Sequence, residues 1–191
     1  MIDRRIALLR GVNVGRAKRV AMADLRALVS GLGYADVRTL LNSGNVVFTV
    51  PDALAGDAAA RIETALVETL GVSSRVVVLT AAEMAIIARE NPLLDVATDP
   101  SRLLVAVPVH PPDRSLLEPL TERGWGPERL ALGERVAYLW CPGGVLASRL
   151  PEAVGRALGG GHSVTIRNWS TMMKLHALAT TESRPADDGK R

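Results

Sequence analysis

Four basic residues with no acid among them follow the first apolar run of this chain: Arg10, Arg16, Lys18 and Arg19. About ten residues separate Arg10 from a helix expected near Met22, whereas strand-to-helix loops usually take two to six. Glycines in the loop permit positive φ angles and close approach of a ligand, and the next helix N-terminus adds N–H donors. The loop is therefore predicted to bind an anion. Its candidate ligand residues are Arg10, Asn13, Gly15, Arg16 and Lys18.

The glycine spacing of this loop matches neither of two common phosphate-binding motifs. Gly11 and Gly15 fit neither the Walker pattern nor Gly-x-Gly-x-x-Gly. The alternative to an anion site is a solvated connection, whose arginines contact only water and nearby carboxylates.

Composition predicts a globular protein with one large domain or two small ones, since the 191 residues are 48% hydrophobic. The net charge is +3, carried by 20 arginines and 3 lysines, so basicity alone is weak support for nucleic-acid binding. The single cysteine, Cys141, excludes an intrachain disulfide. No secretory signal or long apolar run is present, so we expect a cytoplasmic protein without a membrane segment.

The apolar periodicity predicts the order βαββαβ in the first 80 residues, the ferredoxin-like arrangement with an antiparallel sheet. The clearest signal is a hairpin that turns at Asn42-Ser43-Gly44-Asn45. The expected elements are strand 4–10, helix 22–32, strands 37–41 and 46–50, helix 54–70 and strand 75–79.

The same order is predicted a second time after a connector. The expected elements are strand 103–107, helix 116–123, hairpin 129–140, helix 150–158, strand 163–167 and a C-terminal helix 170–179. The fold class predicted is thus α+β, with two tandem ferredoxin-like units. The predicted division is a first unit at 1–80, a connector at 81–100, a second unit at 101–180 and a disordered tail at 181–191.

Several motifs in a fixed order then resemble the bacterial domain-of-unknown-function family numbered 1697. They are Leu8 to Gly15, Met22 with Leu25-Arg26, Val37-Arg38-Thr39, Ser43 to Phe48, Asn91-Pro92, Arg167-Asn168-Trp169 and Lys174-Leu175. The resemblance covers nearly the whole chain except the tail. It implies an α+β fold and supplies no activity. The chain departs from the family pattern at Arg16, where a glycine is expected, and at Leu40, where an aromatic residue is expected.

Other polar residues at element junctions complete the predicted site: Ser43, Asn45, Arg167, Asn168 and Lys174. For Ser43 and Asn45 we favour the turn itself as the explanation, because Ser, Gly and Asn suit a tight hairpin for backbone reasons. Asn168 is also a candidate N-cap. Convergence of these segments with the basic loop is a hypothesis that the fold tests.

Neither a metal, nor a cofactor, nor a catalytic group is predicted. The three histidines lack metal-ligand spacing, and the acids resemble helix-start or turn residues. Tyr138 and Trp140 alternate on one strand, so they are predicted either to form a face that stacks bases or to pack in a core or interface.

Three functions remain open, and whether the protein is an enzyme remains undecided. The leading hypothesis is an anionic small molecule, carrying phosphate or carboxylate, bound at the basic loop. The first alternative is nucleic-acid binding by the same loop. The second is a protein-interaction or scaffold module, in which exposed sheet aromatics such as Trp140 bury against a partner.

Overall fold

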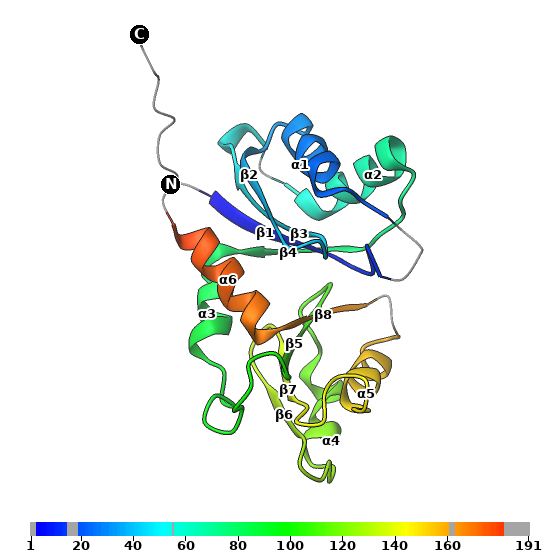
Figure 1. Cartoon of the computed structure of the whole chain (residues 1–191), viewed down its shortest axis with the longest axis vertical. Helices are drawn as coiled ribbons and strands as arrows, with labels where there is room; N and C mark the ends of the chain where they lie inside the picture. Colours follow the sequence, from blue (N-terminus) through cyan, green and yellow to red (C-terminus); the bar gives the residue numbers. More distant parts are fainter. Residues whose placement is uncertain (1–2, 15–18, 55, 161–162, 182–191) are drawn as a thin grey trace.

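The computed structural model describes residues 3–14, 19–54, 56–160 and 163–181 (Figure 1). The first half contains β1 (Asp3–Leu9), α1 (Met22–Gly31), β2 (Ala35–Leu40), β3 (Asn45–Val50), α2 (Ala58–Leu70), β4 (Val76–Thr80) and α3 (Ala81–Arg89). The second half contains β5 (Leu103–Pro108), α4 (Glu118–Thr121), β6 (Arg129–Leu132), β7 (Ala137–Trp140), α5 (Leu150–Ala157), β8 (Val164–Asn168) and α6 (Trp169–Thr180). The fold is α+β, with two four-stranded antiparallel sheets ordered β2-β3-β1-β4 and β6-β7-β5-β8.

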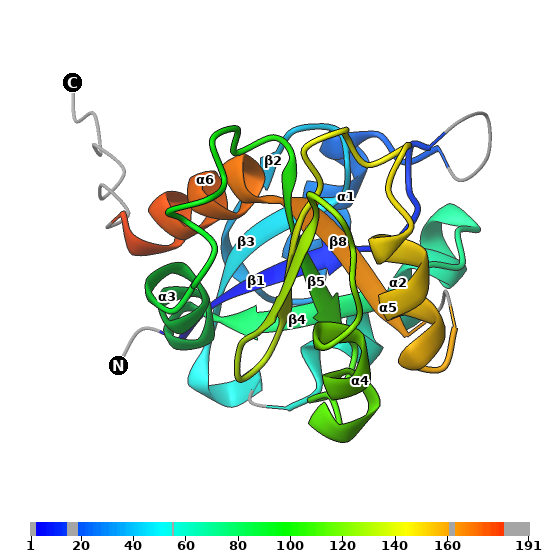
Figure 2. The same ribbon diagram turned by 90° about the horizontal axis from the view of Figure 1, so that it is seen from below.

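The two sheets face each other across one shared hydrophobic core. Ile6, Leu8 and Val47 reach this core from the first sheet, and Val105 and Tyr138 reach it from the second. Helices α1 and α2 cover the outer face of the first sheet, and α4 and α5 cover that of the second (Figure 1). Helices α3 and α6 lie side by side on one flank of the shared core (Figures 1 and 2). The sheet faces that a lone unit would expose are therefore buried here.

This packing overturns the idea of exposed sheet aromatics. Tyr138 is 1% exposed and Trp140 is 7% exposed, and both belong to the shared core. The Tyr138 ring lies 6.3 Å from the ring of Trp169, and its hydroxyl donates to the Ile87 carbonyl at 2.9 Å. A base-stacking face on β7, or a partner surface built on Trp140, is excluded because these side chains are buried in the shared core.

Two helices are shorter in the structure than the sequence predicted. Leu54 has helical spacing with α2, but it lies in a separate 3-10 turn (Asp52–Leu54), and α2 begins after Asp57, whose carboxylate accepts from the Ala60 N–H at 3.0 Å. The helix expected at 116–123 is a 3-10 turn (Arg114–Leu116) followed by the single turn of α4. In both places a local cap or turn, and not the spacing of apolar residues, sets where the helix begins.

The hairpin turn between β2 and β3 lies at the same end of the sheet as the close of β1. Leu8 pairs with Asn45, and the Leu9 N–H donates to the Gly44 carbonyl at 2.8 Å. The loop after β1 and the turn at 42–45 therefore start from adjacent points. In the described part of the chain, no helix combines the length and apolarity needed to cross a bilayer.

Candidate functional site

Arg167 uses all five of its guanidinium N–H groups as hydrogen-bond donors, and three of these bonds join the two halves of the molecule. From β8, its Nε donates to Asn45 Oδ1 at 2.6 Å. Its Nη2 donates to the carbonyls of Leu9 at 2.7 Å and Ser43 at 3.0 Å. Its Nη1 donates to Thr165 Oγ1 at 3.0 Å and to the Ile166 carbonyl at 2.9 Å. Every acceptor is neutral, and three of the five belong to the first half.

Burial without a carboxylate partner sets the electrostatics of this junction. Desolvation lowers the pKa of Arg167 to about 10, so the side chain remains protonated at neutral pH. No ion pair to Arg167 is present among the described residues. Its full positive charge is therefore available to attract an anion, although its donors are already used.

Arg10 bridges the halves in the opposite direction and keeps donors free. Its backbone N–H donates to the Arg75 carbonyl at 2.9 Å, which ties the end of β1 to β4. Its Nε donates to the Val164 carbonyl on β8 at 2.9 Å. Its two terminal nitrogens, Nη1 and Nη2, have no partner among the residues that the structure describes. Arg10 thus presents two N–H₂ groups beside β8.

The outer edge of β8 also presents donors. The Val109 N–H donates to the Ser163 carbonyl at 2.9 Å, so with the two-residue period of an antiparallel ladder the backbone groups of Thr165 and Arg167 face β5. The backbone groups of Val164 and Ile166 then face away from the sheet. Their carbonyls each accept one hydrogen bond from an arginine, whereas their N–H groups have no partner among the described residues. This edge therefore offers unpaired donors, while its acceptors are already partly used.

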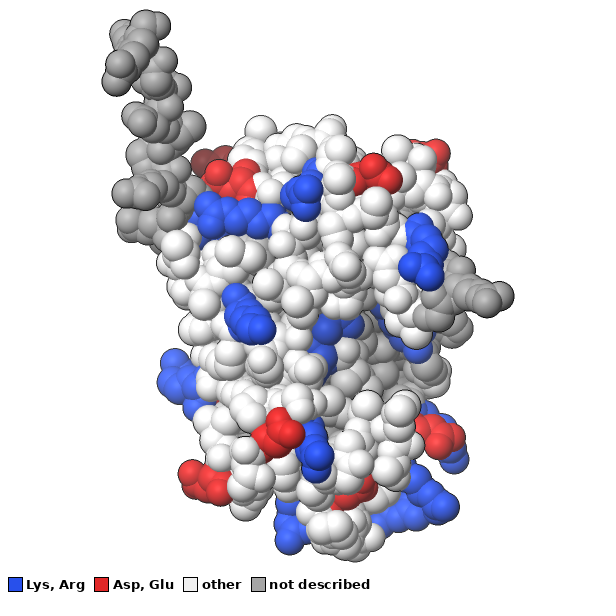
Figure 3. All heavy atoms as spheres, viewed as in Figure 1, with Lys and Arg blue, Asp and Glu red and all other residues white. Residues whose placement is uncertain are grey.

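A cleft of about 600 Å³ lies against this edge. Its wall is formed by the edge of β8, the loop after β1 and α5: Arg10, Gly11, Val14, Pro151, Glu152, Gly155, Arg156, Gly160, Val164, Thr165, Ile166 and Arg167. Three of these residues are arginines and one is an acid, Glu152, which is paired with Arg156 on the exposed side of α5. Figure 3 shows basic side chains at the waist between the halves, with the visible acidic side chains above and below it.

The predicted site residues divide into three groups. Arg10, Ser43, Asn45 and Arg167 converge at the junction, as hypothesised, but of these only Arg10 and Arg167 line the cleft. Asn13 is structural, because its side chain exchanges hydrogen bonds of 2.8 and 2.9 Å with the backbone of Val20 and donates to the Asn42 carbonyl at 2.7 Å.

The remaining predicted residues do not reach the cleft or are not described. Asn168 caps α6 by accepting from the Thr171 N–H at 2.8 Å, and Lys174 is exposed on α6 and does not line the cleft. Gly15, Arg16 and Lys18 lie outside the described residues.

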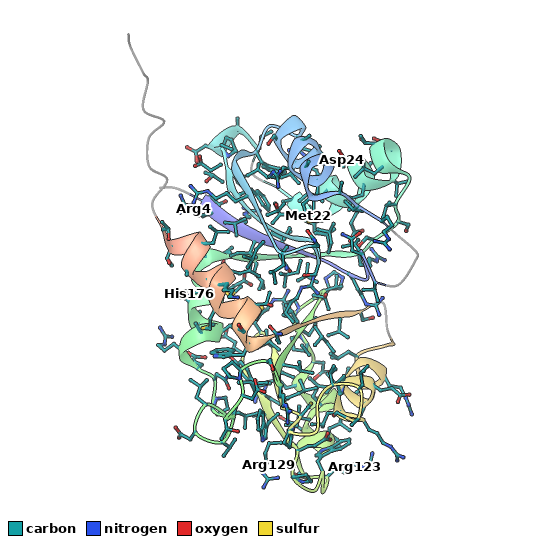
Figure 4. The ribbon with its side chains drawn as sticks, in the orientation of Figure 1. Arg4, Met22, Asp24, Arg123, Arg129 and His176 are labelled. Atoms are coloured by element: carbon teal, nitrogen blue, oxygen red, sulfur yellow. The ribbon has the colours of Figure 1, made fainter. Side chains whose placement is uncertain are left out.

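Three further basic residues lie away from this cleft. Arg123 and Arg129 lie at the far end of the second half, and Arg4 lies at the flank where α6 ends (Figure 4). Among the described residues, no group of His, Cys, Asp and Glu is arranged to hold a metal ion.

Sequence reasoning missed Gly11 and Val14 in the loop after β1, and it missed the part of the cleft wall that comes from the second half. Val164, Ile166 and Gly155 have no polar side chain to signal a site, and they line the cleft through backbone N–H groups and a bare helix surface. The only available signal was that strand 163–167 follows a glycine-rich turn, a feature shared by many solvated loops.

Comparisons with known proteins identify a family and a fold. A family model described as "Protein of unknown function (DUF1697)" matches residues 2–138. The chain is also similar to the conserved bacterial protein SP0830 from Streptococcus pneumoniae, with a TM-score of 0.71 and 22% identity over 94% of this chain and 100% of that one. At this identity the likeness shows the fold alone. The curated proteins include no match to this chain.

Proposed function

The chain belongs to the DUF1697 family, whose members are proteins of unknown function, and we propose that it binds an anionic small molecule, carrying phosphate or carboxylate, in the cleft beside β8. The observation that carries this proposal is the chemistry of the β8 edge. Its two outward carbonyls accept from arginines, and its two outward N–H groups and the Nη groups of Arg10 remain as donors.

An edge with unpaired donors, whose carbonyls already accept from arginines, favours a ligand that brings acceptors and negative charge. An extended peptide that added a strand would need both donors and acceptors along the edge, and a cationic ligand would meet the positive charge of Arg10 and Arg167. A carboxylate or a phosphate only accepts hydrogen bonds, and guanidinium groups bind both in paired geometry. The cleft therefore suits an anion better than a peptide or a cation.

The first half contains an equivalent edge that supplies an internal comparison. There the outward N–H of Val76 on β4 is occupied by Glu63 Oε1 at 2.8 Å, and the outward N–H of Thr80 is occupied by Glu83 Oε2 at 2.8 Å. Val109, which follows β5, is the counterpart of Arg10, which follows β1. Each donates its backbone N–H to the carbonyl of the residue that precedes the neighbouring edge strand, β8 or β4. Carboxylates thus occupy two of the three outward N–H groups of this edge, with that of Val78 as the third, and their negative charge makes it a poorer anion site than the β8 edge.

We also infer that the chain is a tandem pair of ferredoxin-like units, divided as 1–80 and 101–180 with a connector at 81–100. The matching strand orders of the two sheets support this inference. So do the helices that follow β4 and β8 directly, each capped by the last residue of its strand, Thr80 or Asn168. A cytoplasmic location remains a prediction from the sequence.

Nucleic-acid binding by the same loop is the competing proposal, and salt dependence separates the two. A nucleic acid contacting several phosphates loses affinity steeply with added salt, whereas an anion held by one arginine and two backbone groups should lose it gradually. Interaction with a protein partner through sheet aromatics has lost its structural basis, because Tyr138 and Trp140 are buried.

The test is a set of thermal-unfolding measurements with inorganic phosphate, sulfate, phosphate esters and carboxylates. The wild type is compared with Arg10→Gln, which removes the free donors, and with Arg75→Gln, which removes an arginine near the second edge. At a hundred times its Kd, a ligand should stabilise the wild type and Arg75→Gln by about 2.7 kcal/mol. Arg10→Gln should show little stabilisation relative to its own unliganded state. Equal stabilisation of all three proteins would contradict the proposal, as would its absence for every anion.

A further inference from the structure

We infer, on the basis of the proposed anion site, that the ligand is an amphiphilic organic anion whose head group binds Arg10 and the β8 edge and whose apolar body lies along the rest of the cleft. The size of the cleft is the first reason. About 600 Å³ falls within the range of small-molecule sites, roughly 300 to 1,000 Å³, and greatly exceeds what an inorganic anion fills.

The second reason is the apolar wall beside the donors. Val14 follows the end of β1 by five positions and is 70% exposed, yet it lines the cleft with Pro151 and Ile166. An isolated exposed valine is ordinary on a protein surface, but here it stands next to free cationic donors in a concave site. Binding an apolar group against Val14 would remove both surfaces from water.

Gly155 contributes no side chain to this wall of the cleft. Gly155 lies on α5 where it faces β8, and a Cβ added there would stand 3.7 Å from Val164 Cγ1, at ordinary contact distance. Gly155 is buried, so the absence of a side chain lets α5 lie close to β8 along this wall of the cleft.

The lining argues against a nucleotide as the ligand. Bases are commonly held by stacking on aromatic side chains, and no aromatic residue lines the described part of this cleft. An alkyl or acyl chain needs only apolar contact, which valine, proline and isoleucine supply. The class proposed is therefore an alkyl carboxylate or an alkyl phosphate ester.

Calorimetric titration of the full chain with monoalkyl phosphates from methyl to hexyl, and with alkanoates of the same lengths, tests the inference and identifies the head group. Each added methylene should tighten binding by about threefold to fourfold until the cleft is filled. Alkylammonium ions of the same lengths are the control with reversed charge and should not bind.

Val14→Ser should weaken binding of the longest ester about fivefold or more and leave inorganic phosphate unchanged. Val67→Ser is its control, because Val67 is a similarly exposed valine on α2, away from the cleft. Binding that depends on Arg10 but not on chain length would overturn the inference and leave the proposed function standing. A chain-length effect shared by the ammonium series would also overturn it, and binding of none of these anions would overturn both proposals.

Discussion

Arg10 and Arg167 bridge the two halves of the molecule in opposite directions. Arg10 donates from the first half to the Val164 carbonyl on β8, at 2.9 Å. Arg167 donates from β8 to the carbonyl of Leu9, the residue that precedes Arg10, at 2.7 Å. The two guanidinium groups thereby fix the position of the loop after β1 against β8. Both arginines also line the cleft between these segments.

Removing Arg167 should destabilise the fold strongly. Arg167→Met leaves Asn45 Oδ1 and the carbonyls of Leu9 and Ser43 without their donor, and we expect a loss of about 3 kcal/mol in the free energy of unfolding. Arg167→Lys keeps the charge with fewer donors and should lose about half as much. Urea unfolding measures both, with the exposed Arg89→Met as a control expected to change stability by less than about 1 kcal/mol. A loss in Arg167→Met no larger than that of the control would show that the bridge is energetically unimportant.

The turn beneath Arg167 depends on glycine at position 44. Gly44 has a φ of 70°, and a Cβ there would stand 2.5 Å from Val12 Cγ2 and 2.7 Å from Leu9 Cβ. Gly11 has a similar φ of 65° with no atom within 4 Å of its added Cβ. Gly11→Ala should therefore cost only backbone strain, about 1 kcal/mol, and Gly44→Ala should cost at least about 2 kcal/mol more. Equal losses in chemical unfolding would contradict the close packing of this turn.

The sequence predicted the local elements well because their signals are local. The turn at 42–45 contains residues that tolerate special backbone angles, and the capping box of Thr80 and Glu83 marks the start of α3. Core packing of Tyr138 and Trp140 was one of two predictions, and the sequence could not decide between them, since the outcome depends on the packing of the two halves. Likewise the partners of Arg167 in the first half lie more than a hundred positions away in the chain, and no spacing rule connects them.

The shared core predicts that residues 1–80 do not form a stable domain alone. Without the second sheet, the faces of Ile6, Leu8, Val47 and Leu79 would be exposed to water. Circular dichroism and urea unfolding of the 1–80 fragment should show no cooperative transition, or one far weaker than that of the full chain. A cooperative transition of similar midpoint would mean that the shared core adds little stability.

Tyr138 should make the fold less stable at high pH. Burial raises its pKa to about 12, so above pH 10 the unfolded chain loses this proton while the folded protein keeps it, and stability falls as pH rises. Arg167 acts in the opposite sense, because its lowered pKa makes the folded state release a proton first.

Comparing the stability of the wild type with that of Tyr138→Phe separates the effect of Tyr138 on the pH dependence from that of Arg167. At pH 7 the variant should be less stable by about 1 kcal/mol, through loss of the hydrogen bond to the Ile87 carbonyl. Between pH 9 and pH 11 that difference should shift by about 1.4 kcal/mol in favour of the variant. A difference that stays constant with pH would indicate that the hydroxyl titrates normally in the folded protein.

The most direct test of the anion site is a two-dimensional amide NMR titration of the full chain with butyl phosphate. The account predicts saturable shifts at the N–H groups of Val164 and Ile166, because these donors face the cleft, with little change at Val76 and Thr80, whose N–H groups are held by glutamates. The shifts should vanish in Arg10→Gln and persist in Arg75→Gln. Saturable shifts confined to other surfaces, or none at all, would contradict the central claim that the edge of β8 binds an anion.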